Sequence, residues 1–279
     1  MLYNNRQELL NILQRENLFT EKKLGQNFLF NSEIIRKIIQ AADLTNDDEV
    51  LEVGPGLGIL TNELIQQAKR VTTVELDDKL IPYLEKTFSQ ANNLHIVHQN
   101  VLDFIPPEAP YKLIANIPYY ITSPILSHFL QVKTPSLRPT TIVLLVQLEV
   151  AQKICAQTGD HNVLSFQTQI FAKPQIVAKV APGNFVPAPK VDSAILKLDP
   201  LPSPLASNPQ LFIQIIKKCF SQKRKTMLNS LNSFRNLSKD QLTPLLEQAN
   251  ISPQDRPQNL TIEQMEKLCQ AIFNYTKTE

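Results

Sequence analysis

The sequence predicts an α/β protein with a mostly parallel sheet covered by helices on both faces, followed by a smaller helical part. Three observations support this fold class. Short apolar runs alternate with segments of helical spacing between residues 49 and 198, a pattern typical of βαβ units. The stretch Asp199–Pro209 contains four prolines in eleven residues, which is unsuited to a helix or a central strand. After it, the strong periodicities are helical.

Helix-capping residues and the spacing of apolar residues predict the individual helices and strands. Asn31 or Ser32 can cap a first helix whose apolar face carries the isoleucines at 34, 35, 38 and 39. Apolar runs predict strands at Glu49–Val53, Val71–Glu75, Leu94–Val97, Tyr111–Ala115, Thr141–Val146 and Val191–Leu198. Helical spacing between them predicts helices at Gly58–Ala68, Asp78–Phe88 and Pro124–Leu130. Beyond the proline-rich stretch, the same spacing predicts helices at Leu211–Leu231, Lys239–Gln248 and Ile262–Tyr275.

The proline-rich stretch is interpreted as a linker between two domains. A chain of 279 residues has the length of one large domain or two, at roughly 150 residues per domain. We expect a large domain over residues 1–200, with residues 1–21 as a helical extension, and a small all-helical domain over residues 205–279. The alternative is that the prolines form a long surface loop within one domain.

Composition excludes several classes of protein. Hydrophobic residues make up 43% and charged residues 19%, which is ordinary for a globular protein. The longest aliphatic run, Ile142–Val146, is far too short to span a bilayer, and the N-terminus lacks the pattern of a secretory signal. Three cysteines without a CxxC pair favour a reducing compartment. The four histidines show no ligand spacing, so we expect a soluble cytoplasmic protein without a metal.

Charge is unevenly distributed along the chain. The net charge is +2, but residues 1–204 carry 18 Lys+Arg against 20 Asp+Glu, whereas residues 205–279 carry 10 against 6. Lys217–Lys225 holds five cations in nine residues, which on a helix would form a basic stripe able to follow nucleic-acid phosphates. A solvated helix face is the plainer alternative. Lys22 and Lys23 make a smaller basic cluster.

Glycines at 54, 56 and 58 lie between a predicted strand and a predicted helix. Glycine permits positive φ and close approach of a ligand, and a helix N-terminus favours anionic groups. Glu75 ends the next predicted strand, where an acidic side chain accepts hydrogen bonds from ribose hydroxyls. The spacing G-x-G-x-G differs from the dinucleotide pattern, which favours S-adenosylmethionine over a nicotinamide cofactor. A purely structural turn is the alternative.

Asn116–Tyr119, with the sequence NIPY, follows another predicted strand. These residue types suit methylation of an exocyclic amine. The Asn116 side-chain oxygen, with the Ile117 or Pro118 carbonyl, can accept the two N–H bonds, while Tyr119 stacks on a flipped base. Alone the pattern is weak, and a strand-ending turn explains it equally well. The segment Phe185–Pro189 is either a wall beside such a site or a strand-entry loop.

Several segments together resemble the ribosomal RNA adenine dimethyltransferase family. They are Lys22–Leu29, Leu51–Thr61, Thr73–Asp77, Ala115–Leu126, Phe185–Leu198 and Phe220–Leu231. The resemblance runs from about Lys22 to the C-terminus and implies a class I S-adenosylmethionine-dependent methyltransferase, with a Rossmann-like seven-stranded sheet and a C-terminal helical domain. It also implies cofactor-binding roles for these positions: Asn27, Leu29, Gly54, Gly56, Glu75, Asn100 and Asn116.

Within that family the segments are most similar to the bacterial small-subunit branch. This implies N6-dimethylation of two adjacent adenosines in the 3′-terminal hairpin of 16S ribosomal RNA, in precursor small-subunit particles, by a monomer without membrane or metal. Asn116, Pro118 and Tyr119 would be catalytic. Tyr119 and Phe185 would hold the base, and the cations Lys223, Arg224 and Lys225 the RNA backbone. The alternatives are a large-subunit methyltransferase linked to antibiotic tolerance and an assembly factor whose catalysis is dispensable.

The sequence departs from the family pattern at three places. Asn100 stands where aspartate is usual, Leu148 where lysine is common, and His161-Asn162 where Tyr-Gly is common. An amide at position 100 can accept from the adenine amine only without charge assistance. We therefore expect weaker cofactor binding than in an aspartate homologue. The other two departures affect contacts with the RNA or the substrate loop.

Overall fold

The computed structural model describes residues 2–19, 25–106, 108–132, 134–222 and 224–278. The chain divides into two compact units. The first comprises Met1–Ala151 and Pro174–Pro200, and the second comprises Gln152–Lys173 and Leu201–Glu279. The second unit thus takes in residues 152–173, which the sequence analysis placed in the large domain. The domain boundaries at 200 and 205 stay a prediction.

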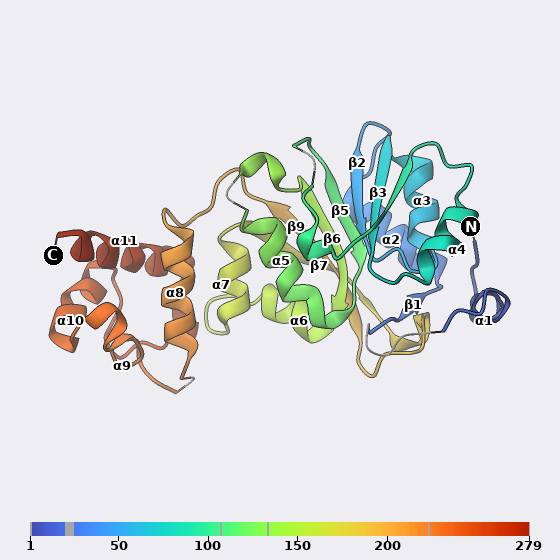
Figure 1. Ribbon diagram of the computed structural model, residues 1–279. Coiled ribbons are helices and arrows are strands. Elements are labelled where there is room, and N and C mark those ends of the chain that lie inside the picture. The colour runs from blue at the N-terminus through green and yellow to red at the C-terminus, as the bar shows by residue number, and fades with distance from the viewer. Residues whose placement is uncertain (1, 20–24, 107, 133, 223, 279) are drawn as a thin grey trace. The chain divides into compact units, whose positions relative to one another are not determined.

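A seven-stranded mixed sheet forms the centre of the first unit (Figure 1). Its strands are β2 (Glu49–Val53), β3 (Arg70–Glu75), β4 (Leu94–His98), β5 (Lys112–Asn116), β6 (Thr141–Gln147), β7 (Ala172–Val180) and β9 (Ser193–Pro200). Their spatial order is β4-β3-β2-β5-β6-β9-β7. The first five pair in parallel, and β9 pairs antiparallel with β6. The predicted α/β class is confirmed, although the sequence analysis missed β7.

Helices cover the sheet on both sides. The first six helices are α1 (Arg6–Arg15), α2 (Ser32–Ala42), α3 (Ile59–Gln67), α4 (Leu80–Thr87), α5 (Thr122–Leu130) and α6 (Leu148–Ile154), of which α6 continues into the second unit. In Figure 1, α2, α3 and α4 lie on one side of the sheet and α5 on the other. The side chain of Asn31 accepts from the Glu33 amide and caps α2, as predicted. The 3-10 turns are η2 (Val101–Asp103), η3 (Tyr119–Ile121), η4 (Pro135–Leu137), η5 (Pro182–Asn184), η6 (Phe234–Asn236) and η7 (Pro257–Asn259).

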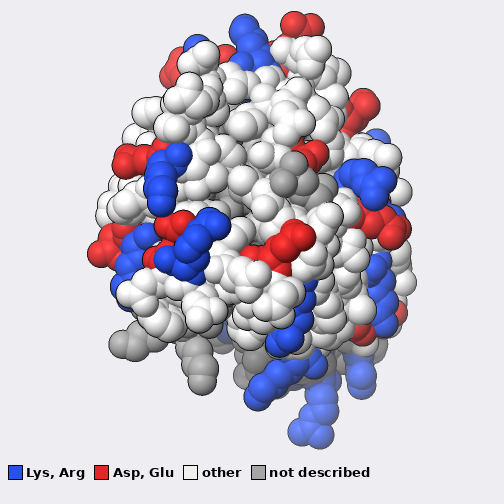
Figure 2. Space-filling model, turned by 90° about the vertical axis from the view of Figure 1, so that its right-hand side faces the viewer, with Lys and Arg blue, Asp and Glu red and all other residues white. Residues whose placement is uncertain are grey.

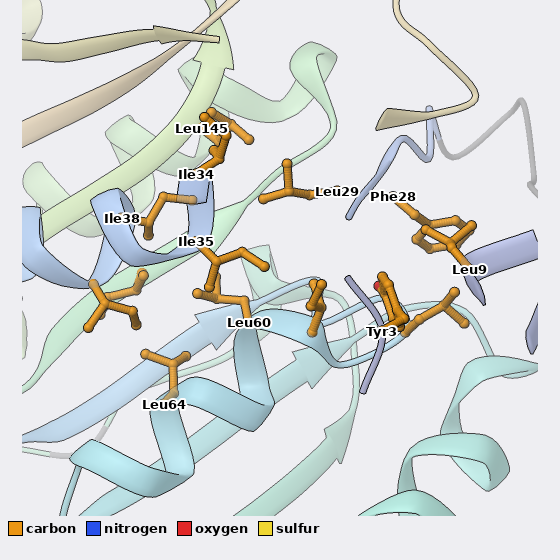
Figure 3. Packing of buried hydrophobic residues seen from close by; sticks show 14 of the residues in the cluster. Tyr3, Leu9, Phe28, Leu29, Ile34, Ile35, Ile38, Leu60, Leu64 and Leu145 are labelled. Carbon is orange, nitrogen blue, oxygen red and sulfur yellow. The ribbon is translucent and has the colours of Figure 1, made fainter. Parts of the chain in front are cut away.

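The isoleucines of α2 form the middle of the main core. Ile35 and Ile38 are fully buried, and Figure 3 shows them between Leu145 of the sheet and Leu60 of α3. Burial of side chains of this size contributes about 1.5–3 kcal/mol each, before the entropy lost on ordering them. The core therefore fixes α2 and α3 against the strands whose ends carry the candidate site.

Register places the candidate residues side by side at one edge of the sheet. Val53 of β2 pairs with Val74 of β3 and with Ala115 of β5. These three strands are parallel, so the residues that follow them emerge together at their carboxyl ends, where α/β sheets bind ligands. Gly54, Glu75 and Asn116 are thereby brought to one place.

A small two-stranded sheet joins distant parts of the first unit. β1 (Phe28–Leu29) pairs antiparallel with β8 (Phe185–Val186), with Leu29 opposite Phe185. All four side chains are buried. Because the partners are more than 150 residues apart in sequence, this pairing could not be seen in the local pattern.

The second unit is mainly helical. Its helices are α7 (Val163–Gln169), α8 (Pro209–Phe220), α9 (Met227–Leu231), α10 (Lys239–Gln248) and α11 (Ile262–Thr278). The single helix predicted over 211–231 is wrong, because α8 ends at Phe220 and α9 begins at Met227. Ser221 caps the C-terminus of α8, and its hydroxyl donates a hydrogen bond to the Lys218 carbonyl at 2.7 Å. The basic segment 217–225 is therefore the end of a helix followed by a turn.

Figure 2 shows acidic and basic side chains interspersed over the middle of one face and basic side chains gathered at its lower edge. Cations near the N-terminal helices are paired: Lys37 with Glu33 at 2.9 Å, and Lys86 with Glu16 at 3.3 Å. In the described part of the chain, no helix is both long and apolar enough to cross a membrane.

Candidate active site

A cavity of about 260 Å³ lies at the carboxyl ends of β2, β3 and β5 within the first unit. Most of the candidate residues line it. These are Asn27, Leu29, Gly54, Gly56, Glu75, Asn100, Asn116, Pro118 and Tyr119. The structure thus brings residues from the ends of β2, β3, β4 and β5 and from the N-terminal loop to one concave surface, as a ligand site requires.

The glycine turn between β2 and α3 leaves room for a ligand. Gly54 has φ +67°, and its amide donates to the Val74 carbonyl at 2.9 Å. A Cβ added there would meet only the Asn116 carbonyl oxygen, 4.0 Å away, so the space before this residue is open. Gly58 serves packing instead, because a Cβ there would lie 2.5 Å from the Phe88 ring. The turn therefore combines an open cradle with a tight helix start.

Glu75 is oriented by backbone amides at the end of β3. Its Oε1 accepts from Leu76 at 2.8 Å and from Asp77 at 2.9 Å, and its Oε2 accepts from Gly56 at 3.4 Å. Burial raises the pKa of this carboxyl, against the lowering effect of those amides. The carboxyl group is held in one orientation beside the glycine turn and the cavity.

Glu52, on β2, is a second buried acid in the cavity wall, which the sequence analysis did not single out. Only 1% of it is exposed, and its Oε2 accepts from the Thr61 hydroxyl at 2.7 Å. Burial raises its pKa to about 8. Tyr3 also lines the cavity and is itself buried. Figure 3 shows Tyr3 in the same cluster as Phe28 and Leu9, so the N-terminal segment contributes to the wall.

Asn116 presents an acceptor to the cavity. Its Nδ2 donates to the backbone carbonyl of Asn27 at 3.2 Å. Because a carbonyl can only accept, the amide must turn its nitrogen to Asn27 and leave Oδ1 on the other side. Within the described ranges, Oδ1 has no hydrogen-bond partner. A half-buried amide oxygen in the cavity is thus available for a donor on a ligand.

Tyr119 and Pro118 form the turn that follows Asn116. The Pro118 carbonyl accepts from the Ile121 amide at 3.2 Å, which leaves it one lone pair for a ligand. The Tyr119 hydroxyl lies 2.6 Å from Oγ of Ser193. Burial raises the pKa of Tyr119, so the phenol stays neutral. Ser193 is a second residue that the sequence analysis did not assign to the site.

Asn100 caps the short turn η2 at the cavity wall. Its Oδ1 accepts from the Leu102 amide at 3.1 Å. A carbonyl oxygen has two lone pairs, so one remains for a ligand amine. The cavity also includes Leu76, half of which is exposed, next to Glu75. An exposed leucine in such a wall is an apolar surface suited to a planar ring.

Some of the predicted residues lie elsewhere. Phe185 is 2% exposed and does not line the cavity, although its strand partner Leu29 does. Arg224 and Lys225 are exposed in the turn after α8, in the second unit. Lys223 lies outside the described residues, as do Lys22 and Lys23. In the described ranges no group of three or more His, Cys, Asp or Glu could hold a metal ion.

Contacts between distant segments explain what the sequence analysis missed. Gln26 donates to Asp77 at 2.7 Å and ties the N-terminal loop to the end of β3. Tyr120 lines the cavity with 60% of its surface exposed. Tyr120 could have been found from the sequence, because it directly follows Tyr119 in the predicted site. No local feature of the sequence marked Tyr3 or Ser193.

The fold and the site together define a class of enzyme. The strand order, with β9 antiparallel between β6 and β7, is the seven-stranded arrangement implied by the family resemblance. The cavity combines an open glycine turn, an oriented carboxylate and an amide oxygen free to accept. This is the fold of a class I methyltransferase, and the cavity lies at the carboxyl ends of its strands, where such sheets bind ligands.

Comparisons with known proteins narrow the class to a family. A profile of the ribosomal RNA adenine dimethylase family matches residues 18–274. A Dehalococcoides mccartyi protein named ribosomal RNA small subunit methyltransferase A is 42% identical over 259 residues, covering 90% of this chain and 88% of the relative. A Clostridium botulinum protein of the same name is 37% identical over 262 residues, covering 91% and 94%. The chain belongs to the ribosomal RNA adenine dimethylase family.

Solved structures agree with this assignment. A dimethyladenosine transferase from Plasmodium falciparum matches with a TM-score of 0.78 and 29% identity, covering 90% of this chain and 98% of that chain. The 23S rRNA methyltransferase ErmE matches with a TM-score of 0.70 and 31% identity, covering 88% and 100%. Both matches extend beyond the sheet, because they cover nearly nine-tenths of this chain or more.

Proposed function

We propose that this protein transfers methyl groups from S-adenosylmethionine to N6 of two adjacent adenosines in the 3′-terminal hairpin of 16S ribosomal RNA, within precursor small-subunit particles. The chemistry is supported by Asn116, which lines the cavity and whose Oδ1 stays free to accept because its Nδ2 is bound to the Asn27 carbonyl. The choice of small-subunit RNA is supported by the relatives named ribosomal RNA small subunit methyltransferase A.

The residues around the glycine turn fit the cofactor. The open space before Gly54 can take the amino-acid end, with Gly56 beside it. The Glu75 carboxylate, already oriented by amides, can accept from ribose hydroxyls, and Asn100 can accept from the adenine amine. Asn27 and Leu29 close this side of the cavity. S-adenosylmethionine supplies an electrophilic methyl group on a sulfonium.

The chain's own residues prepare the amine for transfer. An adenine amine is a weak nucleophile because its lone pair is delocalised into the ring. Acceptance of one N–H by Asn116 Oδ1, and of the other by the carbonyl of Pro118 or Ile117, localises that lone pair. Tyr119 supplies a ring face on which the flipped base stacks. Catalysis then comes from orientation and preorganised acceptors, with no covalent intermediate on the enzyme.

The second unit supplies cations for the RNA backbone. Arg224 and Lys225 are exposed in the turn after α8, and Lys217 is exposed near the end of that helix. Phosphate contacts of this kind position an RNA without reading its sequence. The same role is proposed for Lys223, which lies outside the described residues.

The decisive experiment compares labelled methyl transfer to undermethylated small subunits, large subunits and free RNA. We expect transfer to small subunits, with dimethyladenosine at two adjacent positions. Asn116→Ala should abolish transfer while RNA binding is retained, and Asn11→Ala, an exposed asparagine of α1, should match the wild type. Dimethylation by the Asn116→Ala variant would refute the chemistry.

A large-subunit substrate is the second candidate. The match to the 23S rRNA methyltransferase ErmE, at 31% identity, favours it. The two proposals differ in one measurable outcome. Methyl transfer to large subunits and not to small subunits would contradict the small-subunit proposal and support the large-subunit proposal. Mapping dimethyladenosine on both RNAs after deletion of the gene gives the same decision in cells.

A further inference from the structure

Buried Ser193 contacts the partly buried Tyr119, which lines the cavity. The two hydroxyl oxygens lie 2.6 Å apart, although the residues are 74 positions apart in sequence. Ser193 is completely buried. Among the described residues its hydroxyl has no other hydrogen-bond partner, so loss of the Tyr119 hydroxyl would leave a buried polar group unsatisfied. The hydrogen bond therefore satisfies the buried Ser193 hydroxyl and holds the Tyr119 hydroxyl in place.

Ser193 lies on a strand of the central sheet, whereas Tyr119 lies on a short turn. Ser193 begins β9, where it is paired with Gln147 of β6, and the preceding residue is fixed through the bond from the Leu148 amide to the Asp192 carbonyl at 2.9 Å. Tyr119 sits on the short turn η3, outside the sheet. A hydroxyl held by the central sheet can thus orient a side chain that its own turn would hold loosely.

Tyr119 is consequently restrained at both ends. The Thr122 hydroxyl donates to its backbone carbonyl at 3.0 Å, and Ser193 holds the phenol oxygen at the far end of the ring. With both ends held, rotation of the ring is restricted, and the residue lines the cavity. The hydroxyl is engaged by Ser193, so we expect the ring, and not the phenol oxygen, to meet the substrate.

We propose that Ser193 is a positioning residue that holds Tyr119 so that the tyrosine acts through its ring face and not through its hydroxyl. This inference rests on the proposed function, because it assigns to the ring face the flipped adenine of the RNA. A ring fixed before the base arrives loses no rotational freedom on stacking, which favours the productive orientation. Tyr119 touches the substrate, whereas Ser193 acts through Tyr119.

The test is a double-mutant cycle with Ser193→Ala and Tyr119→Phe in the full-length protein. Loss of one hydrogen bond predicts that each single variant slows single-turnover methyl transfer by about 2- to 12-fold. The double variant should be no slower than either single variant, because both remove the same contact. Cofactor affinity, measured by calorimetry, should be unchanged in all three.

A second readout separates positioning from a general structural effect. With 2-aminopurine in place of the target adenine, stacking on Tyr119 should quench the fluorescence, and Ser193→Ala should weaken that quenching. Ser230→Ala, which removes a buried serine from the second unit, is the matched control and should change neither rate nor quenching. Thermal unfolding shows whether each variant is folded. If Ser193→Ala does not fold, Tyr119→Phe removes the same hydrogen bond and tests the proposal in its place.

Three outcomes would overturn the inference. One is wild-type transfer and quenching by Ser193→Ala. Another is a loss of a hundredfold or more for Tyr119→Phe alone, because the hydroxyl would then take part in the chemistry. The third is a double variant as slow as the product of the two single effects. If the wild-type protein itself transfers no methyl group to RNA, the proposed function fails instead, so the two failures are distinguishable.

Discussion

The Thr61 hydroxyl donates a 2.7 Å hydrogen bond to Oε2 of Glu52 and joins α3 to β2 beneath the glycine turn. Burial raises the pKa of Glu52 to about 8 from 4.5. The folded state therefore binds a proton more tightly than the unfolded chain. The resulting stabilisation is complete below about pH 4.5 and is lost as the pH rises through about 8.

This pair gives a prediction on stability. The free energy of unfolding of the wild type should fall between about pH 4.5 and 8 with a component of up to about 1.4 kcal/mol per pH unit. Glu52→Gln keeps an acceptor for Thr61 but cannot ionise, so this component should vanish. Urea unfolding at several pH values measures it. Glu49→Gln on the same strand is the control, and an unchanged slope in Glu52→Gln would contradict the assignment.

Asn100 gives a prediction on cofactor affinity. Asn100→Asp should keep the cap on the Leu102 amide and add charge assistance to the bond with the adenine amine. We expect S-adenosylmethionine to bind about 3- to 10-fold more tightly, the range that a charge-assisted bond allows. Isothermal titration calorimetry is the measurement. Equal affinity in the two proteins would show that Asn100 does not contact the adenine.

The basic turn gives a prediction on RNA binding. Replacing Lys223, Arg224 and Lys225 together with neutral residues should lower RNA affinity more than replacing any other three cations of the chain. The dependence of log affinity on log salt should become shallower by about 0.7–0.9 for each phosphate contact removed. Filter binding across a salt series measures both quantities. Lys37→Gln, which breaks an exposed pair with Glu33 in the first unit, should alter neither.

Glu266 gives a prediction on the second unit. Its Oε1 accepts from the Ser207 amide at 2.8 Å, the Ser207 hydroxyl at 2.7 Å and Gln270 at 2.8 Å, while 8% of the residue is exposed. Glu266→Ala removes these bonds and should lower the free energy of unfolding by about 2–4 kcal/mol. Chemical denaturation of the full chain measures the loss.

Glu263 provides the matched control on the same helix. It is paired with Lys267 at 2.8 Å on an exposed face, and exposed pairs contribute about 0–1 kcal/mol. Glu263→Ala should therefore cost little. Similar losses for the Glu263 and Glu266 variants would show that the contacts of Glu266 with Ser207 do not stabilise the unit.

Local sequence was sufficient where one segment determines its own structure. Residues 49–53 form the predicted strand, Asn31 caps the predicted helix, and the glycines at 54 and 56 line the cavity. Periodicity and capping are short-range properties, so they can be read from neighbouring residues. The same approach failed at 211–231, where hydrophobic spacing continued across a break between helices that begins at Ser221.

The strand-turn-helix elements and the polar residues at the strand ends could be predicted from the amino-acid sequence, because they depend on neighbouring positions in the chain. Tertiary structure alone decided which distant residues meet there. Tyr3 reaches the cavity wall, Ser193 holds Tyr119, and Phe185 is buried against β1 instead of facing the cavity. The physical reason is that these contacts depend on sheet register and core packing, which join residues with no local relation in the chain.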